Sequence, residues 1–170
     1  MEKITAGMIA AARKRNAEKE SSSMKAVGEI SAIKREVITF LKAEISPIVI
    51  ITGYNADVLE HELAAYPLLF LKYDRYENAQ LLELAQAGVA YLQGKCDQVL
   101  FTPVENPLFG PDTIRRLMDV NAPAVAPACE GRGGHPILLS AEVFPALLRY
   151  HGPGGIPGAC DTFVAEKVTH

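Results

Sequence analysis

The sequence predicts a three-layer α/β domain in which helices cover both faces of a mainly parallel sheet. Short apolar runs rich in β-branched residues alternate along the chain with longer segments in which apolar residues recur every three or four positions. That alternation is typical of βαβ units with right-handed crossovers. At 170 residues, 49% of them hydrophobic and 22% charged, the chain has the size and composition of one globular domain, which we expect to span residues 1–170.

The strands are expected where the apolar runs lie. The clearest is "PIVIITGY", a continuous β-branched run of the kind found in strands buried on both faces. In chain order, the predicted strands are Thr5–Ala11, 47–54, 68–73, Val99–Thr102, 122–128 and 135–140.

The helices are expected between these strands. Ile33, Val37, Phe40 and Leu41 recur at helical spacing. A second apolar edge is expected from Val58, Leu59, Glu62 and Leu63. Asn55 is placed to cap that second helix with its side chain, and Pro111 and Asp112 after Gly110 mark a helix start. The predicted helices are Ser31–Glu44, Ala56–Ala65, Asn78–Leu92, one beginning at Gly110 and one ending at Tyr150.

Composition and sequence pattern argue against several classes of protein. The net charge of −3 argues weakly against nucleic acid as a partner. The longest apolar run, Ile45–Thr52, suits a buried strand rather than a membrane span, and the first residues do not predict a signal peptide. Three scattered cysteines, Cys96, Cys129 and Cys160, form neither a disulfide framework nor a metal-ligand spacing. We therefore expect a cytoplasmic protein that acts away from membranes, and the sequence leaves its oligomeric state open.

Ligands of open parallel sheets bind beyond the carboxyl ends of the strands. A basic segment, Ala12–Lys25, follows the first predicted strand, and Glu105 follows the fourth. The topology would place both on one rim. The basic segment can hold phosphates or be a solvated loop, and Glu105 can bind a metal or be a residue of a turn between two prolines.

Three motifs in this order carry a resemblance to a known family: "IVIITGYNA", "FTPVENPL" and "EGRGGHPILLS". Together they resemble the MobA-like nucleotidyltransferases, the molybdenum-cofactor guanylyl- and cytidylyltransferase group, from about Gly7 to Gly158. The resemblance implies a Rossmann-like fold. It also implies transfer of a nucleoside monophosphate, CMP or GMP, from a nucleoside triphosphate to a phosphorylated acceptor such as molybdopterin, with Mg²⁺ as cofactor and release of pyrophosphate.

The same resemblance implies roles for individual residues. Glu105 stands where the family holds its metal, and Arg132 is the candidate for binding an anionic acceptor. Nucleotide contacts are implied for Ala10, Ala11, Ala12, Gly53 and Asn78, and the catalytic cations for Lys25, Lys19 and Arg15. Structural alternatives stay open: Gly53 serves a tight turn, and Asn78 caps a helix. His135 is expected to be structural rather than catalytic.

The sequence departs from the family pattern where the chemistry is expected. Ala12 replaces a glycine, Ser22 a phosphate-binding lysine, and Glu105 an aspartate, while Pro153 stands in a polar position. The chain also stops at His170, where many relatives continue into a further strand, so we expect it to be truncated relative to them. These departures keep a second hypothesis open, in which a non-catalytic family member binds nucleotide weakly or binds a protein partner.

Overall fold

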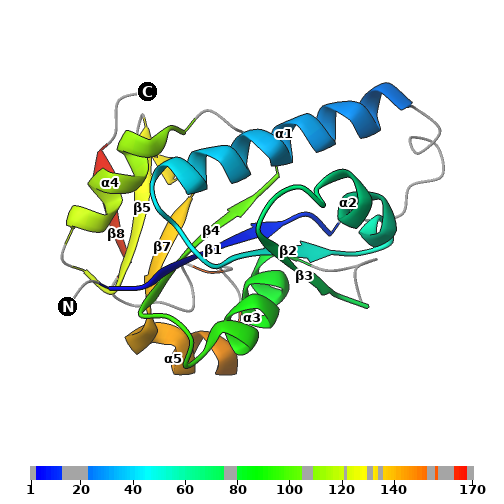
Figure 1. Cartoon of the computed structure of the whole chain (residues 1–170). Helices are drawn as coiled ribbons and strands as arrows, with labels where there is room; N and C mark the ends of the chain where they lie inside the picture. Colours follow the sequence, from blue (N-terminus) through cyan, green and yellow to red (C-terminus); the bar gives the residue numbers. More distant parts are fainter. Residues whose placement is uncertain are drawn as a thin grey trace.

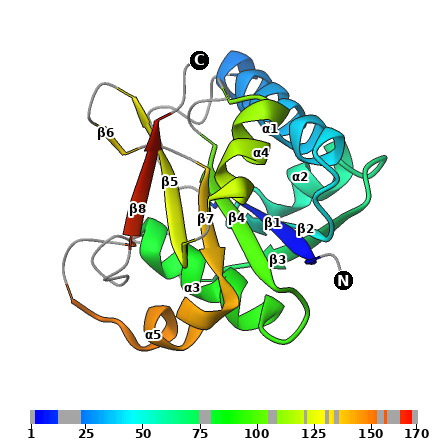
Figure 2. The same ribbon diagram turned by 90° about the vertical axis from the view of Figure 1, so that its left-hand side faces the viewer.

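The computed structural model of the chain describes residues 3–12, 23–74, 80–104, 109–120, 122–129, 132–133, 136–152, 156 and 163–167, with the backbone alone for 23–29, 127–129, 132–133 and 163–167. One eight-stranded sheet runs through this part of the molecule in the order β3-β2-β1-β4-β7-β5-β6, with β8 paired to β5 (Figure 2). The strands are β1 Thr5–Ala10, β2 Ile48–Thr52, β3 Leu68–Lys72, β4 Gln98–Pro103, β5 Ala124–Cys129, β6 Arg132–Gly133, β7 Ile137–Ser140 and β8 Phe163–Lys167.

The predicted mainly parallel sheet is confirmed. β1 pairs in parallel with β2 and β4, β2 with β3, and β5 with β8. β7 is inserted antiparallel between β4 and β5, and β6 is antiparallel to β5. β6 and β8 were not among the predicted strands, because neither segment carries the apolar run on which the other strands were recognised.

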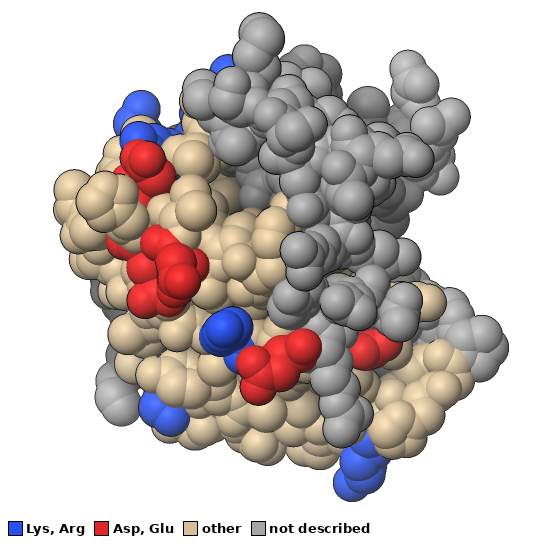
Figure 3. Space-filling view, turned by 90° about the vertical axis from the view of Figure 1, so that its right-hand side faces the viewer, with Lys and Arg blue, Asp and Glu red and all other residues tan. Residues whose placement is uncertain are grey.

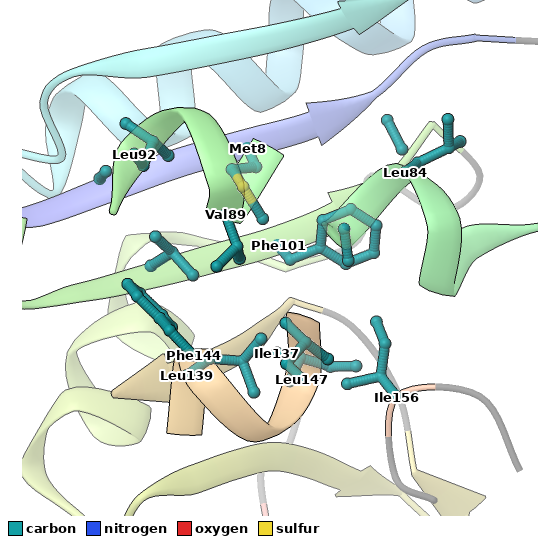
Figure 4. Packing of buried hydrophobic residues seen from close by; sticks show 14 of the residues in the cluster. Met8, Leu84, Val89, Leu92, Phe101, Ile137, Leu139, Phe144, Leu147 and Ile156 are labelled. Atoms are coloured by element: carbon teal, nitrogen blue, oxygen red, sulfur yellow. The ribbon is translucent and has the colours of Figure 1, made fainter. Parts of the chain in front are cut away.

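Helices cover both faces of the sheet, as predicted (Figure 1). The helices are α1 Ser23–Lys42, α2 Ala56–Glu62, α3 Leu81–Leu92, α4 Pro111–Asp119 and α5 Phe144–Arg149, the last preceded by a 3₁₀ turn at Ala141–Val143. Buried residues of α1, α2 and α4 share one apolar cluster with Ile9, Ile50 and Leu100 of the sheet. Those of α3 and α5 share another with Met8 and Phe101, shown in Figure 4. The molecule is therefore a three-layer αβα domain.

Two glycines let helices approach the central strand β1 closely from either side. A Cβ on Gly7 would lie 2.6 Å from Cδ2 of the Phe40 ring on α1. A Cβ on Gly88 of α3 would lie 2.4 Å from Sδ of Met8. Both distances are shorter than carbon contacts allow, so the helices sit where they do because these positions lack a side chain.

The sequence misplaced some helix boundaries and faces. α1 begins at Ser23 rather than Ser31, because its first two turns lack the apolar periodicity that located the rest. Leu41 is 37% and Val58 53% exposed, although both were expected on apolar faces. On α2 the buried face instead follows the spacing of Ala56, Leu59 and Leu63. Val58 lies one residue, or roughly 100°, away from that face.

Candidate functional site

The parallel strands β1, β2, β3 and β4 all end at one edge of the sheet, on the right in Figure 1. Figure 3 looks onto this edge, where uncharged and acidic side chains make up most of the described surface. Backbone hydrogen bonds continue past the strand ends: the Ala11 N–H donates to Ile51 C=O at 2.8 Å, and the Val104 N–H to Ala10 C=O at 3.3 Å. The ends of the central strands thus form one connected rim, as the sequence predicted.

Asn55 joins two turns of this rim. Its Oδ1 accepts a hydrogen bond from the Gly53 N–H at 3.2 Å, and its Nδ2 donates to the Ala11 C=O at 3.1 Å. The predicted side-chain cap of α2 is wrong, because Asn55 makes no such hydrogen bond to the helix. Its amide group instead forms hydrogen bonds that link the turn after β2 to the residue after β1. Gly53, buried at the end of β2, is part of the same turn.

The alanines after β1 turn their side chains into the protein. Ala10 is 6% and Ala11 4% exposed, and they pack into opposite apolar clusters. Ala12 is partly buried against the same cluster as Ala10. The side chains of Ala10 and Ala11 therefore face the core rather than the rim, and the Ala11 N–H is already donated to the Ile51 C=O.

Several predicted site residues are not placed by the structure. Lys25 lies in the first turns of α1, and Arg132 begins β6, but their side chains are outside the described part. Helix α1 begins on the side of the site edge (Figure 1). Outside the described residues altogether are Arg15, Lys19, Ser22, Asn78, Glu105, His135 and Pro153.

A hydrogen bond anchors the segment between β3 and α3. Tyr73, the residue after β3, donates from its hydroxyl to Oε2 of Glu83 at 3.0 Å. Glu83 lies in the first turn of α3. The contact joins the residue after β3 to the first turn of α3.

A buried carboxyl group lies under the rim and was missed by sequence reasoning. Glu36 of α1 is 1% exposed, and burial raises its pKa to about 8. Its Oε2 lies 3.5 Å from Oγ1 of Thr102, near the end of β4. Within the described ranges, Oε1 of Glu36 and Oγ1 of Thr52 have no hydrogen-bond partner. The signal was present in the sequence, because Glu36 follows Ile33 by three residues and lies on the apolar face of its helix.

The described residues do not form a protein-only metal site. Among them, no group of three or more His, Cys, Asp or Glu side chains is arranged to hold a metal ion. Among the helices described, none has the length and apolar character needed to cross a membrane.

A family model for the MobA-like NTP transferase domain matches residues 23–166. The chain belongs to the MobA-like NTP transferase family. The resemblance seen in the motifs is thereby confirmed for most of this MobA-like domain. Among curated proteins, none matches the chain significantly.

Solved structures of similar fold cover nearly the whole MobA-like domain. Rv0371c from Mycobacterium tuberculosis H37Rv, solved in complex with manganese, is 18% identical with a TM-score of 0.71, over 98% of this chain and 89% of that one. A nucleotidyl transferase from Methanothermobacter is 19% identical with a TM-score of 0.69, over 92% and 80%. A 4-diphosphocytidyl-2C-methyl-D-erythritol synthase from Anaerococcus prevotii is 10% identical with a TM-score of 0.74, over 99% and 90%. At these identities the similarity establishes the Rossmann-like fold.

Proposed function

We propose that this domain transfers a nucleoside monophosphate, CMP or GMP, from a nucleoside triphosphate to a phosphorylated acceptor such as molybdopterin. The proposal is carried by one observation, made in a domain of the MobA-like NTP transferase family: the ends of its central parallel strands lie together at one edge of the sheet. The loop after Ala11, the Gly53 turn and the end of β4 leading to Glu105 meet at one edge of the sheet. Ligands of such sheets bind at this edge. A neighbouring fold named as a diphosphocytidyl synthase supports the cytidylyl alternative.

The reaction would proceed by direct displacement. An oxygen of the acceptor phosphate attacks the α-phosphorus of the nucleotide, the bond from the α-phosphorus to the bridging oxygen of the β-phosphate breaks, and pyrophosphate leaves with that oxygen. Negative charge grows on the leaving group, and cations lower the barrier by neutralising it. We assign this role to Lys25, Lys19 and Arg15. Lys25 lies near the start of α1, where the helix dipole also favours phosphate.

The substrate would be held mainly by backbone groups of the rim. Because the Ala11 N–H is donated to the Ile51 C=O, we assign phosphate binding to the N–H groups of the loop from Ala12 onward, and Gly53 allows the nucleotide to approach β2 closely. We assign Asn78 to the nucleotide side of the site. Arg132 is assigned to the anionic acceptor, since a guanidinium binds phosphate through two parallel hydrogen bonds.

The site suits a divalent metal that arrives with the nucleotide. Mg²⁺ in phosphoryl-transfer sites takes one or two carboxylates from the protein and fills its shell with phosphate oxygens and water. We assign the protein carboxylate to Glu105, which stands at the position where the family holds its metal. When bound, the metal supplies charge neutralisation at the phosphates. Compared with aspartate, the side chain of Glu105 is longer by one methylene group. Its carboxylate therefore lies ~1.5 Å farther from the backbone.

A second candidate is a family member that binds nucleotide or a protein partner without catalysis. The observation in its favour is Ala12, whose side chain packs on the core where relatives have a glycine. The changes at Ser22, Glu105 and Pro153 point the same way.

Calorimetric titration with CTP, GTP and ATP, each with and without Mg²⁺ or Mn²⁺, distinguishes the two candidates. The proposal expects metal-dependent binding of CTP or GTP and pyrophosphate release when acceptor is added. Glu105→Gln should weaken metal-dependent binding about tenfold or more. Asp119→Asn, an exposed carboxylate at the last residue of α4, is the matched control and should bind as the unchanged protein does. Metal-independent binding without turnover would favour the second candidate, and no binding of any nucleotide would contradict both nucleotide hypotheses.

A further inference from the structure

The buried carboxyl of Glu36 contacts the strand that leads to the proposed metal residue. Thr102 of β4 has two oxygen neighbours: Oε2 of Glu36 at 3.5 Å and the carbonyl oxygen of Pro103 at 3.1 Å. Pro103 is the last residue of β4, and the next residue, Val104, donates its N–H to the Ala10 C=O at 3.3 Å. Thr102 therefore links helix α1 to the end of β4. Val104 is the last described residue of this range, and Glu105 follows it in the sequence.

The Thr102 hydroxyl is the donor in both contacts. A threonine hydroxyl carries one hydrogen, which Oε2 of Glu36 and the Pro103 C=O therefore share. The result is a chain of hydrogen-bond contacts from Glu36 through Thr102 to Pro103.

The surroundings favour a carboxyl group that keeps its hydrogen. The neighbours of Glu36 on the buried face of α1, Ile33, Val37 and Phe40, are fully buried, as is Leu100, two residues before Thr102. They belong to one apolar cluster. A carboxylate in such a place loses its hydration, which disfavours the charged form. Burial accordingly raises the pKa of Glu36.

We propose that Glu36 is a positioning residue that acts through Thr102 to hold in place the Pro103–Val104 end of β4, which precedes Glu105 in the chain. The contacts above are the evidence that Glu36 and Thr102 restrain β4. The effect of this restraint on metal–nucleotide binding rests on the proposed function. Removing a group that hydrogen-bonds to a metal ligand and orients it typically lowers the affinity for the metal by 10- to 100-fold.

The test compares variants that keep the chain of hydrogen bonds with variants that break it. Glu36→Gln and Thr102→Ser preserve an acceptor oxygen and a hydroxyl, whereas Glu36→Met and Thr102→Val remove them with little change in volume. The first readout is hydrogen exchange at the Val104 amide, and the second is calorimetric binding of Mn²⁺ with CTP. We expect Glu36→Met and Thr102→Val each to speed exchange at Val104 about tenfold and to weaken Mn²⁺–CTP binding to a similar degree. The double variant should be no worse than either, because the two act as one unit.

Thr5→Val is the matched control. Thr5 accepts a buried hydrogen bond from Nε2 of Gln98 at 2.8 Å, between the same two strands but at the opposite end. Its loss should lower stability without changing exchange at Val104 or Mn²⁺–CTP binding. Equal exchange at Val104 in all variants would overturn the proposal, as would an equal effect of Thr5→Val. Changed exchange in a protein that binds no metal–nucleotide would support the positioning of β4 and contradict the proposed function.

Discussion

At the scale of single residues, Glu36 shows how burial can override a side chain's ordinary charge. It lies on the apolar face of α1 with a fractional exposure of 1%. Its described hydrogen-bond partner is Thr102. An ionised carboxylate there would be poorly compensated, so the neutral form is favoured and the pKa rises.

The raised pKa predicts a pH dependence of stability. In the unfolded chain Glu36 loses its proton near its ordinary pKa of 4.5, whereas in the folded protein burial raises that pKa to about 8. Between these values the native state binds more protons, so the contribution of Glu36 to stability falls as pH rises, by at most ~1.4 kcal/mol per pH unit. The contribution of Glu36 to stability is fully present below pH 4.5 and is lost above about pH 8.

Urea unfolding of the unchanged protein and Glu36→Gln, at several pH values between about 5 and 8, measures this contribution. The difference in unfolding free energy between the two proteins should shrink or reverse steadily as pH rises. A difference that stays constant with pH would show that Glu36 is ionised in the folded protein throughout.

At the scale of elements, the position of α1 depends on the absence of a side chain at Gly7. The Phe40 ring packs where a Cβ at this position would lie, and Ile45 Cγ2 would be 3.1 Å from it. Both Phe40 and Ile45 are buried, so neither can move aside without disturbing the cluster around it.

Gly7→Ala should therefore destabilise the protein by about 1–3 kcal/mol through overpacking. Chemical denaturation measures the change. Gly110→Ala is the control, because a Cβ there meets nothing within 4 Å and the backbone is extended with φ −116°. Adding Phe40→Leu to Gly7→Ala should recover part of the loss. Equal stability of Gly7→Ala and Gly110→Ala would mean that α1 can shift away from β1 at little cost.

At the scale of the whole molecule, the site edge is assembled from segments far apart in the sequence. Asn55 donates to the carbonyl of Ala11, 44 residues earlier, and thereby joins the turn after β2 to the loop after β1. The same side chain accepts from Gly53. One amide group thus positions two of the loops that we assign to the nucleotide.

Asn55→Asp separates the two roles of this amide. The carboxylate can still accept from the Gly53 N–H, but it cannot donate to the Ala11 C=O and would repel that oxygen. We expect a loss of stability of about 1–3 kcal/mol and nucleotide affinity at least tenfold weaker, measured by denaturation and by calorimetry. Gln93→Glu, at an exposed position just after α3, adds the same negative charge and is the control. Unchanged nucleotide binding in Asn55→Asp would contradict the role of this rim in binding.

The sequence by itself determined the α/β class, the central strands and the family. Those follow from local signals: β-branched runs such as Ile48–Thr52, helical spacing from Ile33 to Phe40, and three motifs in order. It also predicted which strand ends would meet, because parallel strands share their carboxyl edge.

Only the tertiary structure decided what individual polar groups do. Asn55 has the sequence position of a helix cap, yet its side chain makes no capping hydrogen bond and its amide instead donates to the Ala11 C=O, 44 residues earlier. The short strands β6 and β8 exist through their pairing with β5 rather than through an apolar pattern of their own. Glu36 reads as a charged helix residue until the sheet is packed against it, and then burial makes it neutral. For Asn55, β8 and Glu36 the deciding partner is distant in the chain, and a local pattern does not identify such a partner.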